Sequence, residues 1–227
     1  MSRLLQLEIE KLKGQLLSLS AIVEDTVYRA VQSLSKRDAL LARGVIDTDV
    51  HIDESEVDIE EECQKVLALH QPVANDLRFI IAVLKINAEL ERIGDATVNI
   101  TERVLFLVGE EPVNVPFDFA GMAQKAEQML HRSLDALVNL DLGLAYDVIA
   151  SDDEVDSINR GMYGLIEECI RKNPDRVESY IHLLDISRHI EHIGDHASNI
   201  AEDVVYLIEG KIIRHRTEEY KHRPPQT

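Results

Sequence analysis

Apolar residues recur at helical spacing along almost the whole of this 227-residue chain. Between Leu16 and Leu34 the steps from one apolar residue to the next are three, four or one, which places these side chains on one stripe of a helix. The chain contains only ten glycines and six prolines, so few positions interrupt the pattern. The sequence therefore predicts an all-α fold.

Turn signals divide this pattern into six long helices. Pro72 ends one helix, because proline cannot continue a helix interior, and Asn173-Pro174 separates the last two. The densest turn signal, with one glycine and two prolines at 109–116, marks the boundary between two halves of the chain. The expected helices span about 3–36, 38–69, 73–108, 117–140, 142–172 and 174–210.

The second half of the chain repeats the first. The segment ERIGDATVN at 91–99 returns as EHIGDHASN at 191–199, with Glu, Ile-Gly-Asp and Asn at the same spacing. A shift of about 103 residues also aligns Glu24 with Glu127 and Asp49 with Asp152. We therefore expect two tandem three-helix bundles, residues 1–111 and 112–213, followed by a disordered tail at 214–227.

Each repeat carries four carboxylates that a helix hairpin brings level. Residues equally far from the turn of an antiparallel hairpin lie at the same height, and Asp53 stands as far before Pro72 as Glu91 stands after it. The same holds for Asp49 and Asp95. The second repeat places four acids in the same way about Asn173-Pro174: Asp152, Asp156, Glu191 and Asp195.

Level carboxylates indicate a cation site, because they repel one another unless a positive charge lies among them. Oxygen ligands suit magnesium, calcium, manganese or iron. Asn99 and Asn199 are spaced to donate a hydrogen bond to a ligating carboxylate. The alternative is that these acids face solvent or pair with lysine and arginine, but the recurrence of the quartet at matching height favours the cation.

Three histidines add a weaker signal in the second repeat only. His189, His192 and His196 can share a face with Asp195, which would favour a transition metal such as zinc. Because the first repeat has no equivalent, we rank His192 and His196 below the carboxylates.

Charge and composition narrow the partners and the compartment. The chain has 24 basic and 42 acidic residues, a formal net charge of −18, which disfavours nucleic acid and suits cations or basic protein surfaces. Glu8 and Glu10 interrupt the first apolar stretch, so we expect no signal peptide. Two isolated cysteines and no long apolar run then predict a cytoplasmic protein that meets a membrane only through partner proteins.

Enzyme motifs do not fit this sequence. His192-Ile-Gly-Asp-His196 lacks the glutamate that a zinc-protease helix carries after its first histidine. The third and sixth expected helices lack the Glu-x-x-His pair of carboxylate-bridged di-iron bundles, and no glycine-rich phosphate loop occurs. We therefore expect a protein that is not an enzyme.

The doubled motif resembles the PhoU family of phosphate-signalling proteins. The resemblance runs from the first helix to about residue 210 and rests on QPVANDLR at 71–78 and on the Glu-x-x-x-Asp pattern in ERIGDATVNI and EHIGDHASNI. It departs where the second repeat reads RVESY at 176–180.

The resemblance implies a cytoplasmic negative regulator that is not an enzyme and that forms a homodimer. Such a protein would link the ATPase subunit of a phosphate ABC transporter to a phosphate-sensing histidine kinase. Members with this motif bind metal clusters, which carries over onto Glu91, Asp95, Glu191 and Asp195.

The sequence therefore leaves three hypotheses about function. The first is an adaptor whose bound metal, such as iron, manganese, magnesium or zinc, neutralises the acidic residues and shapes a docking face. The second is a metal-independent acidic helical scaffold whose binding weakens with salt. The third, which we rank last, is a carboxylate-bridged metalloenzyme.

Overall fold

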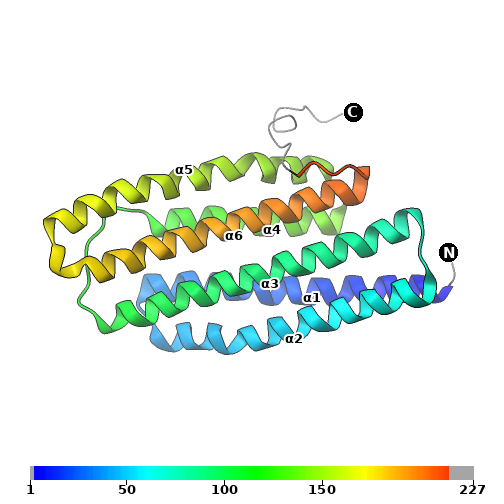
Figure 1. Ribbon diagram of the computed structural model, residues 1–227, viewed down its shortest axis with the longest axis horizontal. Helices are drawn as coiled ribbons and strands as arrows, with labels where there is room; N and C mark the ends of the chain where they lie inside the picture. Colours follow the sequence, from blue (N-terminus) through cyan, green and yellow to red (C-terminus); the bar gives the residue numbers. More distant parts are fainter. Residues whose placement is uncertain (1–2, 215–227) are drawn as a thin grey trace.

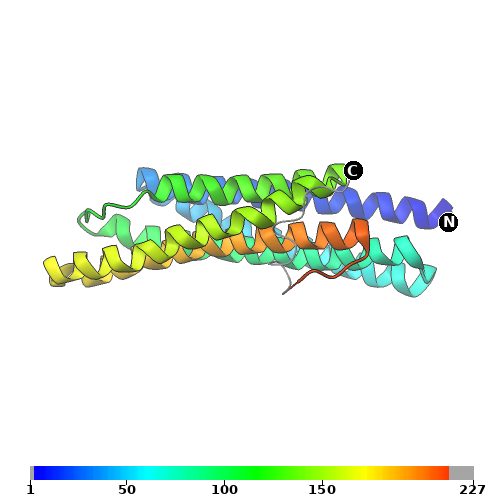
Figure 2. The same cartoon turned by 90° about the horizontal axis from the view of Figure 1, so that it is seen from above.

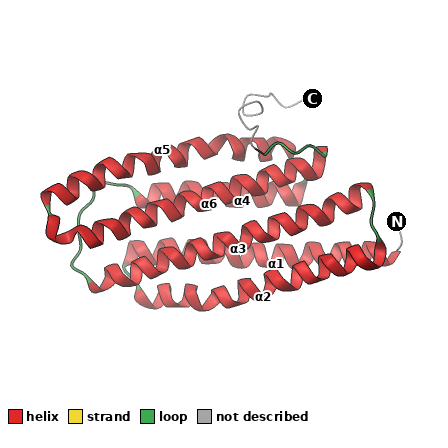
Figure 3. Cartoon of the chain, viewed as in Figure 1, coloured by secondary structure: helices red, strands yellow, loops and turns green. Residues whose placement is uncertain are grey.

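The computed structural model describes residues 3–214, and in this range the chain forms six α-helices and no strand, which confirms the all-α prediction (Figures 1 and 3). The helices are α1 (Arg3–Lys36), α2 (Ala39–His70), α3 (Ala74–Gly109), α4 (Phe119–Asn139), α5 (Leu142–Lys172) and α6 (Val177–Glu209). A short 3-10 turn, Pro174–Arg176, precedes α6.

The six helices run along the long axis of an elongated molecule. Figure 1 places α1–α3 in one half and α4–α6 in the other, with α3 and α6 in contact along the middle. Figure 2 shows that α1 and α4 form a further layer behind them, where α1 packs on α3 and α4 packs on α6. The buried apolar side chains of both repeats belong to one hydrophobic cluster, so the repeats share a core. No helix within residues 3–214 is both long and apolar enough to cross a membrane.

Side-chain caps set most helix boundaries close to those expected. Asp38, Asp118 and Asp141 each precede a helix and accept hydrogen bonds from backbone N–H groups of its first turn. Gln71 ends α2 in the left-handed conformation, just before Pro72. Pro174 opens the 3-10 turn, because a proline has no N–H to lose at a first helical position.

Arg214 is the one residue of the predicted disordered tail that lies within the described range. Its guanidinium lies near buried acids of α3 and α6. Ile213 beside it is 1% exposed. The rest of the predicted tail, 215–227, lies outside the described residues.

Candidate functional site

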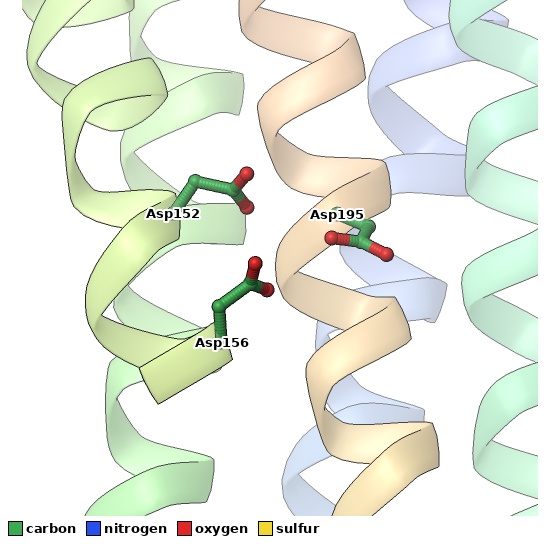
Figure 4. Close-up of side chains that lie close together, drawn as sticks. All are labelled: Asp152, Asp156 and Asp195. Atoms are coloured by element: carbon green, nitrogen blue, oxygen red, sulfur yellow. The ribbon is translucent and has the colours of Figure 1, made fainter. Parts of the chain in front are cut away.

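Three carboxylates of the second repeat converge between α5 and α6. Asp152 and Asp156 lie one turn apart on α5, Asp195 faces them from α6, and one oxygen of each lies within 4.8 Å of the others (Figure 4). All three side chains are partly buried. The hairpin argument placed Asp152 level with Asp195 and Asp156 one turn away, and the structure brings the three together.

Burial and mutual repulsion act strongly on Asp195. Desolvation, followed by the charges of Glu191, Asp152 and Asp156, raises the pKa of Asp195 from 3.8 to about 7. The site therefore favours a bound proton or cation over three ionised carboxylates. Its ligand atoms are all carboxylate oxygens, a donor set that fits magnesium, calcium, manganese or iron better than zinc.

The first repeat gathers its four acids more loosely. The pKa of Asp49 is raised to about 6, mainly by burial and then by the negative charges of Asp53 and Asp95. The pKa of Glu91 is raised in the same way, by burial and then by the charges of Asp95, Asp53 and Glu56. Asp53 and Asp95 are nevertheless exposed, and within residues 3–214 the second-repeat trio alone brings three potential ligands within 4.8 Å. The two repeats therefore differ in how closely their acids converge.

The remaining predicted site residues lie at the margins of these clusters. Glu191 stays outside the trio, with its Oε2 atom 3.7 Å from Nε2 of His192. Burial lowers the pKa of His192. The amide of Asn99 donates to the backbone carbonyl of Asp95 at 2.8 Å, whereas the sequence predicted a bond to a carboxylate. A helical asparagine can reach back to the carbonyl four residues earlier, and here that local bond forms.

Comparison with known proteins assigns this arrangement to a family. The sequence model of the PhoU domain matches twice, at residues 16–104 and 119–204. The chain belongs to the PhoU family. Each PhoU domain matches one repeat and contains the four acids predicted for it.

Individual PhoU proteins match over nearly their full length. The chain is 36% identical to the phosphate-specific transport system accessory protein PhoU homolog of Aquifex aeolicus, over 92% of this chain and 95% of the relative. It is 33% identical to the crystal structure of PhoU from Pseudomonas aeruginosa, with a TM-score of 0.87 over 91% and 99% of the two chains. For the phosphate transport system regulatory protein PhoU from Streptococcus pneumoniae the values are 29% identity, a TM-score of 0.82, and 92% and 98% coverage.

The two PhoU domains are joined by a buried carboxylate that the sequence analysis missed. Glu89 of α3 is 3% exposed, and its Oε2 atom lies 2.7 Å from Nδ1 of His196 and 3.0 Å from Nδ2 of Asn199, both on α6. Arg92 donates to its other oxygen at 3.0 Å. Despite the desolvation, these partners hold the pKa of Glu89 below its usual value.

This contact involves two residues that the sequence analysis placed elsewhere. Asn199 was expected to support a metal-binding carboxylate and His196 to be a possible ligand, and in the structure both side chains face Glu89 of the other repeat. The signal was present in the sequence, because Glu89 interrupts the buried stripe that contains Ile86 and Ile93. A charged residue on a core-facing stripe predicts a buried partner.

A second group of charges continues this junction along α6. Lys85 of α3 donates to Asp203 at 2.6 Å, and Asp203 is 2% exposed. The guanidinium of Arg214 lies 3.8–3.9 Å from carboxylate oxygens of Glu89, Glu202 and Asp203. The junction between the PhoU domains is therefore partly ionic, with α3 and α6 held by opposite charges at several levels.

Proposed function

We propose that this chain is a cytoplasmic regulator of phosphate transport that binds metal and acts as an adaptor rather than an enzyme. In this proposal it contacts the ATPase subunit of a phosphate ABC transporter and a phosphate-sensing histidine kinase, and it restrains both when phosphate is plentiful. The relatives are named as accessory or regulatory proteins of phosphate transport, which supports the process. The observation that carries the metal-binding part is the convergence of Asp152, Asp156 and Asp195.

The trio would hold the cation through carboxylate oxygens. The cation would supply positive charge where desolvation and like charges otherwise favour a protonated Asp195. Asp152 and Asp156 position their carboxylates from successive turns of α5, and Asp195 closes the site from α6. Metal loading would thereby change the charge of this surface without requiring the helices to rearrange.

Metal analysis of matched variants tests the site. Elemental mass spectrometry of protein purified without chelator should find metal in the wild type. It should find none in the triple variant Asp152→Asn, Asp156→Asn, Asp195→Asn. The matched control changes the first-repeat equivalents, Asp49, Asp53 and Asp95, to asparagine. Because those acids converge less closely, this control should retain more metal than the second-repeat variant. Equal and negligible metal in all three helical proteins would refute metal binding.

A separate binding experiment tests the adaptor role. The purified ATPase subunit of the phosphate transporter is titrated with wild-type protein, with and without chelator, and with the second-repeat variant. An adaptor controlled by metal should bind differently after chelation, and the variant should behave like chelated wild type. Binding that ignores chelator and weakens steadily with salt would instead support the acidic scaffold. Absence of binding under every condition would remove this partner from the proposal.

A further inference from the structure

A cavity of about 460 Å³ lies where the ends of several helices meet, away from the carboxylate trio. It is bordered by α1, the start of α3, the end of α4 and the end of α6. Leu207 of its lining is twelve residues beyond Asp195 on α6, which corresponds to about 18 Å along the helix. The volume is in the range of small-molecule binding sites.

The walls of this cavity are apolar and unusually exposed. Leu17 is 43% exposed, Val138 55% and Leu140 57%, and all three line the cavity beside the partly buried Phe79. Scattered exposed leucines need no explanation, but a group of them around one hollow indicates a binding surface. The walls are therefore suited to an aliphatic group.

Leu140 also adopts a costly backbone conformation. It ends α4 with φ 51° and ψ 43°, in the left-handed region, where glycine or asparagine is the usual residue. A branched side chain at such a position costs stability that glycine would not. Leu140 nevertheless lines the cavity, where its side chain would contact a ligand.

The polar lining carries positive charge. Among the described residues 3–214, those that line the cavity include no acid, and the polar ones are Lys13, Asn75 and Arg78. Within residues 3–214 no carboxylate forms an ion pair with Arg78, whose guanidinium lies against Gly210 and reaches the carbonyl of Leu207 only at 3.5 Å. Lys13 is paired with the exposed Glu10 at 2.8 Å, so Arg78 is the main unpaired charge.

We propose that this cavity binds a small aliphatic carboxylate, with the hydrocarbon chain against Leu17, Phe79 and Leu140 and the carboxylate at Arg78. The fork of an arginine guanidinium matches a carboxylate, and a few polar groups in an apolar pocket fix a ligand's orientation. The site is independent of the metal site and of the proposed adaptor role. Binding is therefore measured on chelator-treated protein, where loss of metal has no bearing on the result.

A head-group series tests the charge part of the proposal. Isothermal titration calorimetry compares decanoate, decanol and decylammonium, each below its aggregation concentration, against the full-length wild-type protein. Decanoate should bind at least tenfold more tightly than decanol, because a hydrogen bond to a charged group adds to the apolar contact. Decylammonium should bind most weakly. Octanoate should bind less tightly than decanoate by about fourfold for each methylene removed.

Two variants separate the charge from the apolar wall. Arg78→Gln should remove the preference for decanoate over decanol and leave decanol binding unchanged. Leu140→Gly should weaken decanoate and decanol alike, and glycine suits the left-handed position, so this variant should stay folded. The matched control is Arg160→Gln on α5, which removes an exposed arginine outside the cavity lining and should leave all ligands unaffected.

Three results would overturn the proposal. One is absence of decanoate binding to a folded wild-type protein, as judged by circular dichroism. Another is equal affinity for decanoate and decanol, which would show that any apolar molecule enters. The third is an Arg78→Gln variant that keeps the wild-type preference for the carboxylate. The first result is also the one expected if the natural occupant of the cavity is a peptide or protein, because such a site need not bind a free fatty acid.

Discussion

Replacing Asp195 by asparagine should stabilise the metal-free protein at slightly alkaline pH. The change removes one negative charge from the trio at almost constant side-chain shape. Folding raises the pKa of Asp195 from 3.8 to about 7, so ionised Asp195 opposes folding. At about 1.4 kcal/mol per pKa unit this corresponds to roughly 4 kcal/mol. Since the side chain is partly exposed and its neighbours can move apart, we expect about half, or about 2 kcal/mol.

The sign of the pH dependence follows from the direction of that pKa change. Between pH 3.8 and about 7, folded Asp195 holds a proton that the unfolded chain has lost. The unfolding free energy of the wild type therefore falls as pH rises through this window. The advantage of Asp195→Asn should be absent near pH 4 and fully present above about pH 7.

Thermal unfolding in chelator gives the measurement. For a domain of this size about 2 kcal/mol corresponds to a rise of about 4–8 °C in Tm at pH 8, and the difference should vanish near pH 4. Asp58→Asn, at an exposed aspartate of α2, is the matched control and should leave Tm almost unchanged. A lower Tm for Asp195→Asn at pH 8, or a gain of equal size at both pH values, would refute the argument. Metal should stabilise the wild type more than the variant, because the ligand must be deprotonated.

Three further sets of substitutions test other parts of the structure by chemical or thermal unfolding. Lys85→Met should lower the unfolding free energy by about 2 kcal/mol, because it leaves buried Asp203 without its 2.6 Å partner. Adding Asp203→Leu should recover most of this loss, and no recovery would show that the pair is not the cause. Gly194→Ala should stabilise α6 by up to about 1 kcal/mol, because the new methyl would make ordinary contacts with Met129 and Val155 at 3.6 Å. Gly94→Ala should stabilise α3 less, or destabilise it, because its methyl would crowd Ile52 at 3.1 Å. Equal effects at the two glycines would contradict this packing. Leu140→Gly should stabilise the ligand-free protein by about 0.5 kcal/mol, and a clear loss would show that the leucine contributes to packing instead.

The sequence was sufficient for the helices because their signals are local. Apolar spacing, the aspartates that cap α2, α4 and α5, and the prolines near helix ends lie within a few residues of the boundaries they set. The hairpin argument also placed Asp152 level with Asp195, because both helices of a hairpin share one turn. These features need no knowledge of which helices from different repeats meet.

The remaining features depend on that packing between repeats. Nothing local shows that α3 lies against α6, so the partners of Glu89, namely His196 and Asn199, were not predictable from the motif that contains them. Similarly, repeat symmetry predicted equivalent acid clusters, but Asp53 and Asp95 are exposed whereas Asp156 and Asp195 are partly buried. Small differences in helix packing decide whether carboxylates four residues apart converge.

The contact of Glu89 with His196 and Asn199 also bears on how the duplicated halves have diverged. The aligned position of the second half is His189, which is not an acid, so Glu89 of the first half accepts hydrogen bonds for which the second half supplies the donors. Two copies of the first half would bring Glu89 against Ala96 and Asn99 and would lack the imidazole. The halves have therefore become complementary and are no longer interchangeable. A chain that contained either half twice would retain the helices but lose the contact of Glu89 with His196 and Asn199 between the two halves.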